Sequence, residues 1–310
     1  MNIAFFGSAD FSVPSLHALL NSGHTVSCII TQPDRKKGRG MHMGVTAIKE
    51  AGRSLGIPLC QPENVNSPES LGMLRKLAPD LFVVIAYGQL LSGELLRIPR
   101  LLPVNIHASY LPWYRGAAPI NWALIRGERE TGVTVIKMTE KMDAGPIILQ
   151  ERVQILDSDT GAALEHRLAE AGACLILEAI ERIDNRSFEL FPQDERSVSF
   201  APKLKKENGL IDWSKTSRDI YNLVRGVQHR PGAYTHLQGR FLKIHSVSEC
   251  DDFSAGRHPG EIIGISKEGI KVAAGKGSVN IRELQPEGKR VMKAEEFISG
   301  HKIKPGDRLG

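Results

Sequence analysis

The N-terminal part of the chain alternates short apolar runs with segments whose apolar residues recur at helical spacing. The apolar runs are nearly continuous, which is typical of strands buried on both faces in a parallel sheet covered by helices. Ser12 stands at the start of the first helical segment, where we expect it to cap the helix. The pattern predicts strands at residues 3–6, 24–30, 81–86 and 104–107 and helices at residues 12–21, 45–55 and 68–77.

Two further apolar segments, residues 131–138 and 147–153, are expected to form antiparallel strands. Residues 160–183 show a long amphipathic pattern, which predicts a helix that closes this domain. Together these elements predict a doubly wound, mostly parallel α/β sheet over residues 1–184.

The pattern changes after residue 184. Residues 185–208 are polar, contain proline and have no clear period, so we expect a linker. Residues 209–310 show short apolar segments between glycine and charged turns, which is typical of a small β-barrel of the kind that includes oligonucleotide-binding (OB) folds. The predicted elements are a helix at residues 217–227 and strands at residues 234–237, 241–247, 260–265, 269–273 and 279–284.

Composition fits this two-domain plan. A length of 310 residues suits two domains, and a hydrophobic fraction of 41% lets each bury a core. The net charge of +5 is unevenly placed: residues 1–204 carry 21 Lys and Arg against 22 Asp and Glu, whereas residues 205–310 carry 19 against 13. The C-terminal excess favours a polyanionic partner, although a basic surface that only keeps a domain soluble would give the same count.

Composition also indicates the cellular compartment in which the protein acts. The N-terminus shows no basic segment followed by a long apolar stretch, and no apolar run reaches about 18 residues, so we expect neither a signal peptide nor a membrane span. The four cysteines are scattered without a CxxC pair, which favours free thiols in a reducing compartment. We therefore expect a cytoplasmic protein that acts as a monomer, away from membranes.

The turn after the first strand invites a nucleotide-binding interpretation, since strand–glycine–helix starts many dinucleotide folds. Gly7, however, is followed by Ser-Ala-Asp-Phe-Ser, without the further glycines that let a pyrophosphate approach the backbone. An NAD enzyme is therefore disfavoured. The ten histidines show no HExxH or other metal-ligand spacing, so no metal is expected.

Candidate chemistry begins at the end of the strand predicted at residues 104–107. Asn105 and His107 lie two residues apart, so their side chains point to the same face, and ligands bind at such strand ends in open α/β sheets. An amide donor beside an imidazole suits a carbonyl that becomes a tetrahedral oxyanion, because Asn donates a hydrogen bond and His donates or shuttles a proton. The alternative is that both residues only cap the strand end and bind loop backbone.

A second element is the turn Asp143-Ala144-Gly145-Pro146, which follows the strand predicted at residues 131–138. A carboxylate held in this turn could orient His107, stabilise its charged form and relay a proton. Asp in an Asp-x-Gly turn more commonly binds only its own backbone, so Asp143 alone does not distinguish a catalytic carboxylate from an ordinary turn residue.

Taken together, these motifs resemble the family of 10-formyltetrahydrofolate-dependent formyltransferases. The resemblance is carried by Asn105-x-His107, by Ser109-Tyr110-Leu111-Pro112, and by Asp143-x-Gly145 after a Gly-Val-Thr strand. It implies a Rossmann-like catalytic domain in which Asn105 and His107 polarise the formyl carbonyl and Asp143 assists the proton transfers. The formyl donor that it implies is the reduced folate 10-formyltetrahydrofolate.

The resemblance also implies where the folate binds. Four places depart from the family's usual residues. A tyrosine stands at 110 in place of leucine, a tryptophan at 113 in place of arginine, and Gln228-His229-Arg230 in place of Asn-Pro-Trp; residues 41–44 replace a usually more basic continuation of the loop before them. The implied folate-binding residues are Ser109, Tyr110, Leu111 and Pro112, with Ala86, Tyr87 and Gly88 in another part of the pocket wall.

Members of this family formylate glycinamide ribonucleotide, amino sugars or methionyl-tRNA, and three features favour the last. The sequence PDRKKGRG at residues 33–40 resembles a loop that contacts the tRNA acceptor stem; a basic run between glycines fits phosphate contact, although such runs are often only solvated. The sequence RGAAPI at residues 115–120 has the form found in the tRNA enzymes. GLIDW at residues 209–213, RPGAY at residues 230–234 and GHKIKPGDRLG at residues 300–310 resemble their appended tRNA-binding domain.

The resemblance therefore implies transfer of a formyl group to the amino group of initiator methionyl-tRNA, as needed for translation initiation. Two rivals are a formyltransferase that acts on a nucleotide-linked amino sugar and a non-catalytic RNA-binding protein. The implied tRNA-binding residues are Arg35, Lys36, Lys37 and Arg39, and Phe11 is the residue implied to touch the methionine side chain.

Overall fold

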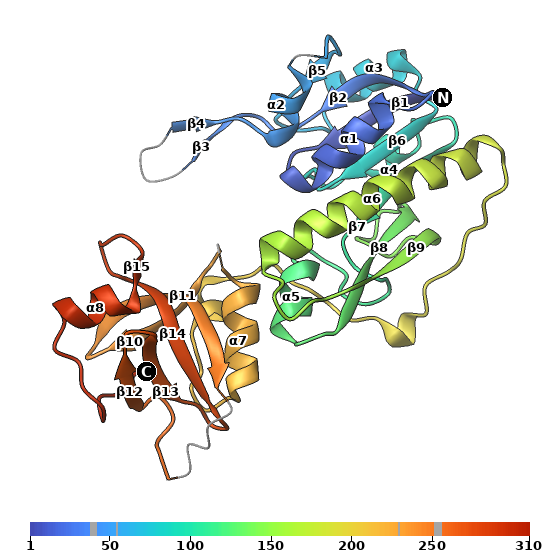
Figure 1. The fold of residues 1–310 in the computed structure, drawn as a ribbon. Coiled ribbons are helices and arrows are strands. Elements are labelled where there is room, and N and C mark those ends of the chain that lie inside the picture. The colour runs from blue at the N-terminus through green and yellow to red at the C-terminus, as the bar shows by residue number, and fades with distance from the viewer. Residues whose placement is uncertain (38–41, 54, 229, 251–255) are drawn as a thin grey trace. The chain divides into compact units, whose positions relative to one another are not determined.

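The computed structural model describes residues 1–37, 42–53, 55–228, 230–250 and 256–310, which form two compact units (Figure 1). Most of the predicted linker, residues 185–201, belongs to unit 1. The boundaries that we predict at residues 184 and 208 stay predictions. Unit 1 comprises Met1–Pro119, Thr131–Gln154 and Glu165–Ala201, and unit 2 comprises Ile120–Glu130, Ile155–Leu164 and Pro202–Gly310.

Unit 1 is built on a seven-stranded sheet with the strand order β5-β2-β1-β6-β7-β8-β9. The strands from β5 to β7 pair in parallel, and β8 runs antiparallel to β7. The mostly parallel sheet predicted from the sequence is confirmed. Its strands are β1 (Asn2–Gly7), β2 (Thr25–Ile30), β5 (Leu59–Cys60), β6 (Leu81–Ile85), β7 (Leu102–His107), β8 (Glu130–Lys137) and β9 (Ile147–Gln154).

The strand order reverses between β1 and β6. From β1 the chain moves outward through β2 to β5, and it then crosses to β6 on the other side of β1. The connections that leave β1 and β6 therefore diverge, and the carboxyl ends of these two strands are the place where this class of sheet binds ligands. Both strands are fully buried at their centres, as Phe5 and Val83 show, so they offer a rigid base.

Ser12 occupies the N-cap position of α1 (Val13–Leu20), as predicted, but its side chain makes no capping hydrogen bond. A short 3-10 turn, η1 (Asp10–Ser12), precedes the helix, and the Ser12 hydroxyl donates to the carbonyl of Ala9 at 2.6 Å. Its backbone is helical rather than extended, unlike that of the usual N-cap residue. The other helices of this part of the chain are α2 (Ala47–Gly52), α3 (Pro68–Leu77), α4 (Gly93–Leu96) and α6 (Gly161–Asp184).

Helix α6 supports the strand that ends at the candidate site. A Cβ atom added at Gly172 of α6 would lie 3.3 Å from the Ile106 side chain of β7, so helix and strand are in close contact. Among the described residues, no helix is both long and apolar enough to cross a membrane. The hydrophobic pattern did not predict the antiparallel hairpin of β3 (Arg35–Lys37) and β4 (His42–Gly44).

Unit 2 contains a six-stranded antiparallel sheet with the order β10-β11-β14-β13-β12, in which β15 pairs with β14. An extended segment joins its two edges, because Leu309 pairs with Leu237 and Arg308 pairs with Glu261. This bridging gives the sheet its barrel character. The elements are α5 (Pro119–Ile125), α7 (Ser217–Gly226), β10 (Ala233–Leu237), β11 (Arg240–Cys250), β12 (Ile262–Ser266), β13 (Gly269–Ala273), β14 (Ser278–Pro286), β15 (Met292–Lys293) and α8 (Ala294–Gly300).

Tyr87 lies directly beyond β6 and belongs to the core of unit 1. Its ring meets Phe6 edge-on, with 5.5 Å between the ring centroids, and its side chain is buried. The hydroxyl has no hydrogen-bond partner among the described residues. Burial therefore raises the pKa of this phenol well above its ordinary value of about 10.

We expect this buried phenol to weaken the fold at alkaline pH. Above about pH 10 the unfolded chain loses the Tyr87 proton while the folded chain keeps it, so the free energy of unfolding falls as the pH rises. Tyr87→Phe should lessen that fall and leave the value at pH 8 unchanged within about 1 kcal/mol, since no hydrogen bond is lost. Urea denaturation of the two proteins between pH 8 and pH 11 measures the free energy of unfolding at each pH. If that free energy fell equally with pH in wild type and in Tyr87→Phe, the fall would not come from the Tyr87 phenol.

Candidate active site

Asn105 and His107 stand on the last part of β7, and strand alternation places both on one face. The strand is held from both sides, since Asn105 pairs with Val84 of β6 and with Ile136 of β8. His107 pairs with Thr134 of β8 and is only 6% exposed. The central sheet thus fixes the backbone of an amide and an imidazole at its carboxyl edge.

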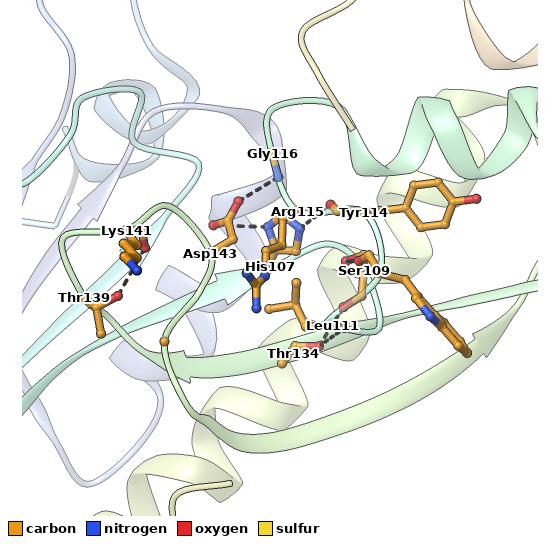
Figure 2. A network of polar contacts seen from close by, with 12 residues as sticks. His107, Ser109, Leu111, Tyr114, Arg115, Gly116, Thr134, Thr139, Lys141 and Asp143 are labelled. Carbon is orange, nitrogen blue, oxygen red and sulfur yellow. Dashed lines mark hydrogen bonds and ion pairs between the residues drawn. The ribbon is translucent and has the colours of Figure 1, made fainter. Parts of the chain in front are cut away.

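The imidazole of His107 is held by two loops (Figure 2). Its Nε2 lies 2.9 Å from the carbonyl oxygen of Tyr114. Because a carbonyl only accepts hydrogen bonds, Nε2 carries a proton in this geometry. Nδ1 lies 3.6 Å from Oδ1 of Asp143, which is an ion-pair distance when the ring is protonated. The second nitrogen is therefore the one that can gain or lose a proton beside a carboxylate.

Asp143 is held in a conformation that few side chains favour. Its φ angle is +52°, in the left-handed region, and its side chain is 14% exposed. Oδ2 accepts the backbone N–H of Gly116 at 2.8 Å, which leaves Oδ1 towards His107 (Figure 2). The arrangement differs from the ordinary Asp-x-Gly turn, because the carboxylate is bound by a residue 27 positions away.

These contacts define what the cluster can do chemically. Because Nε2 is bonded to the Tyr114 carbonyl, Nδ1 is the nitrogen from which the ring can donate to an oxygen that gains negative charge, and the nearby Asp143 carboxylate favours a proton there. The neutral ring can accept a proton from an attacking amine. Asn105, on the same face of β7, has an amide that can add a second donor for an oxyanion.

The loop after β7 is fixed by Thr134 of β8. The Thr134 hydroxyl donates to the carbonyl of Ser109 at 2.7 Å and accepts the N–H of Leu111 at 3.1 Å (Figure 2). The Ser109 hydroxyl donates to the carbonyl of Trp113 at 2.6 Å, so both ends of the loop are tied. Ser109 and Leu111 are buried, so this part of the loop packs against the domain rather than standing open to solvent.

Two residues that depart from the family pattern meet in space. The rings of Tyr110 and Trp113 have centroids 6.1 Å apart, and the guanidinium of Arg152 lies 4.2 Å from the centroid of the Tyr110 ring. Trp113 is 42% exposed. A cation stacked on an aromatic pair therefore stands beside Leu111 and Pro112 on this loop.

Ala86, Tyr87 and Gly88 follow β6 at the point where the strand order reverses. Ala86 has a φ of +46° and Gly88 a φ of +90°, so the chain turns sharply here. The Ser8 hydroxyl, beyond β1, donates to the carbonyl of Tyr87 at 3.0 Å and joins the two strand ends. Phe11 lies in the turn after β1 and is buried.

The basic loop is described only in part. Arg35, Lys36 and Lys37 form β3, and Arg35 makes an exposed ion pair with Glu63 at 3.2 Å. Nothing is described of the side chains of Lys36 and Lys37, and Arg39 lies outside the described residues. Within the part of the chain that the structure describes, no group of three His, Cys, Asp or Glu side chains is placed to hold a metal ion.

Sequence reasoning did not identify three residues that organise the cluster. Tyr114 acts through its carbonyl and Gly116 through its N–H, so their side chains carry no signal of these roles. Thr134 offered one signal, because it is a polar residue in an otherwise apolar strand segment. Its partners depend on the β7–β8 register, which the pattern does not specify.

Models of known protein families match this chain and agree with the sheet and the cluster at its edge. A formyl transferase family model matches residues 1–180, and the model of the formyl transferase C-terminal domain matches residues 203–302. The chain therefore belongs to the formyl transferase family.

The relatives that match over the full length are named for one particular activity. The chain is 44% identical to methionyl-tRNA formyltransferase of Geobacter metallireducens, over all of this chain and 99% of the relative. It is 43% identical to that of Citrifermentans bemidjiense, over all of this chain and 96% of the relative, and 40% identical to that of Acetivibrio thermocellus, over the whole of both.

Solved structures share the fold at lower identity. An N-formyltransferase from Helicobacter canadensis, in complex with folinic acid and dTDP-3-aminofucose, is 20% identical with a TM-score of 0.69, over 90% of this chain and 98% of its own. HypX from Aquifex aeolicus, in complex with tetrahydrofolic acid, is 17% identical with a TM-score of 0.63, over 98% of this chain and 50% of its own.

We expect Gly145→Ala to displace Asp143 and to lower the turnover number about a hundredfold, because small misplacements at a reacting centre have effects of that order. A Cβ atom at Gly145 would lie against the backbone carbonyl oxygen of Lys137, which cannot move without breaking its strand. Steady-state formyl transfer measures the effect. Gly72→Ala is the matched control, since its Cβ would meet nothing within 4 Å, and it should keep full activity. Full activity of Gly145→Ala would contradict this account.

Proposed function

We propose that this chain transfers the formyl group of 10-formyltetrahydrofolate to the free amino group of initiator methionyl-tRNA. The observation that carries the proposal is the cluster of His107 and Asp143 at the end of β7, beside Asn105 on the same strand face. The likeness to methionyl-tRNA formyltransferases supports the acceptor, because it extends through unit 2 as well as unit 1. The acceptor belongs to translation initiation, which makes the cytoplasm the proposed compartment.

In the proposed reaction, Asn105 and the protonated His107 donate to the oxygen of the formyl group, His107 through Nδ1, because Nε2 is bonded to the Tyr114 carbonyl. The α-amine attacks the formyl carbon, and a C–N bond forms while the carbonyl becomes a tetrahedral oxyanion. Collapse of that intermediate breaks the bond to N10 of the folate. One proton leaves the attacking nitrogen and one reaches N10, and Asp143 supports this exchange by stabilising the charged form of His107.

The binding roles are likewise proposals. The turn at residues 86–88 and the loop at residues 109–112 flank the carboxyl edge of the sheet, which supports a folate site there. The positive side chains of Arg35, Lys36, Lys37 and Arg39 would contact tRNA phosphates. Phe11, in the turn after β1, would meet the methionine side chain of the acceptor.

A direct assay tests the acceptor. We expect label from formyl-labelled 10-formyltetrahydrofolate to appear on charged initiator tRNA and not on a nucleotide-linked amino sugar. Labelling of the sugar alone would replace the proposal with the rival formyltransferase. No labelling of either acceptor, together with intact tRNA binding, would favour the non-catalytic RNA-binding protein.

We expect His107→Ala to lower the turnover number about a hundred- to ten-thousand-fold, the range for losing a general acid–base or an oxyanion donor. Binding of initiator tRNA, followed by filter retention, should stay within about twofold, because the imidazole is buried and does not form the proposed phosphate-binding surface. Near-normal turnover would remove His107 from the chemistry.

We expect Lys37→Ala to weaken tRNA binding and to reduce the slope of the logarithm of the binding constant against that of salt concentration by about 1, as for one lost phosphate contact. Lys76→Ala, which removes an exposed positive charge from α3, is the control and should leave that slope unchanged. Equal salt slopes for the two variants would exclude Lys37 from phosphate contact.

A further inference from the structure

Gln193 lies in residues 185–201, a segment of unit 1 that forms none of the strands of the sheet. Two residues earlier, Phe191 exchanges two backbone hydrogen bonds with Ile147 at the start of β9, at 2.8 and 2.9 Å. A 3-10 turn, η2 (Glu195–Ser197), begins two residues later. The backbone on both sides of Gln193 is therefore fixed, and its half-buried side chain faces the loops of the candidate site.

The side-chain amide of Gln193 uses both of its ends. Nε2 donates to the carbonyl oxygens of Asp143 and Gly145, each at 2.8 Å. Oε1 accepts two N–H bonds from the guanidinium of Arg115, from Nε at 2.9 Å and from Nη2 at 2.8 Å. A primary amide has two N–H donors and one acceptor oxygen with two lone pairs, so all of its hydrogen-bonding capacity is used.

These four bonds join the two loops that meet in the cluster. Arg115 directly precedes Gly116, whose N–H binds the Asp143 carboxylate. Gln193 thus binds the main chain of Asp143 through Nε2. Through Oε1 it binds Arg115, which is the neighbour of Gly116. Asp143 has a left-handed backbone, and such a conformation persists only where surrounding contacts over-determine it.

Arg115 has a second partner, the carboxylate of Glu195, but a negative charge cannot take over the role of the Gln193 amide. Its side chain is 7% exposed and pairs with Glu195 at 2.9 Å, while Glu195 itself is 72% exposed. Glu195 supplies only acceptor oxygens, so it cannot donate to the carbonyls of the Asp143 loop. Among the hydrogen bonds of the described residues, Gln193 is the side chain that both accepts from this guanidinium and donates to that loop.

We propose that Gln193 is a positioning residue for formyl transfer: its amide clasps the Asp143 loop to the Arg115 loop and so sets the distance between the Asp143 carboxylate and His107. The proposal rests on the role proposed above for Asp143. Gln193 itself need not touch either substrate. It acts by holding the backbone of Asp143, whose carboxylate lies beside His107.

The test uses the full chain with Gln193→Met, which keeps the length of the side chain but cannot form these bonds, and Gln193→Glu, which keeps the acceptor for Arg115 but faces two carbonyls with a carboxylate. We expect kcat to fall about ten- to a hundredfold in both variants. KM for each substrate should change less than about threefold, because no binding contact is removed. Glu189→Gln, an exposed residue of the same segment, is the control and should behave as wild type.

A double-mutant cycle with Asp143→Asn separates positioning from a merely structural role. If Gln193 acts through the Asp143 carboxylate, adding Gln193→Met to Asp143→Asn should change kcat less than about twofold further. Multiplying losses would overturn the proposal. Rates are compared at equal concentrations of folded protein, and if the Met variant does not fold, the same cycle is run with Gln193→Glu.

The two proposals fail in different ways. Wild-type turnover in Asp143→Asn would refute the proposed site and the clasp together. A collapse of turnover in Asp143→Asn with wild-type kcat in Gln193→Met and Gln193→Glu would refute the clasp alone. A rise in KM without a fall in kcat would assign Gln193 to substrate binding and would also overturn the proposal.

Discussion

The candidate site depends on keeping one carboxylate, that of Asp143, directed at an imidazole although it stands on a loop. A mostly buried carboxylate must receive hydrogen bonds, or its desolvation would destabilise the fold. The Gly116 N–H supplies one at 2.8 Å, and Nδ1 of His107 lies 3.6 Å away. Every other feature of the site either brings a loop to this carboxylate or prevents it from turning away.

The two halves of the cluster are fixed by different means. His107 stands on β7, which pairs with β6 and β8, so the sheet itself fixes its backbone. The loops lie outside the strand ladder and are held by side chains from other segments, Thr134 and Gln150 for residues 109–111 and Gln193 for residues 143–145. A strand gives rigidity without further help, whereas each loop needs its own anchoring residue.

Much of the fold was predictable because its signals are local. Continuous apolar runs specify buried parallel strands, and α3 lies at residues 68–77, where its apolar period predicts a helix. Asn105 and His107 could be found because a strand end carries two polar groups at a spacing of two. Ser12 stands at the predicted N-cap, but its side-chain bond could not be foreseen, because a 3-10 turn precedes the helix and the hydroxyl donates to Ala9. Gln193 left no trace in the pattern, since its partners lie 48 to 78 residues away and two of the four partner atoms are backbone carbonyl oxygens.

The left-handed backbone at Ala86, Tyr114 and Asp143 has a consequence for how this enzyme can change. Such conformations are unfavourable for residues with a side chain, so this region opposes folding locally and relies on the surrounding scaffold to compensate. A glycine at any of these positions would relieve the conflict and could raise the melting temperature, yet it would free the backbone that aims the reacting groups. Selection for thermal tolerance and selection for turnover would therefore pull these three positions in opposite directions.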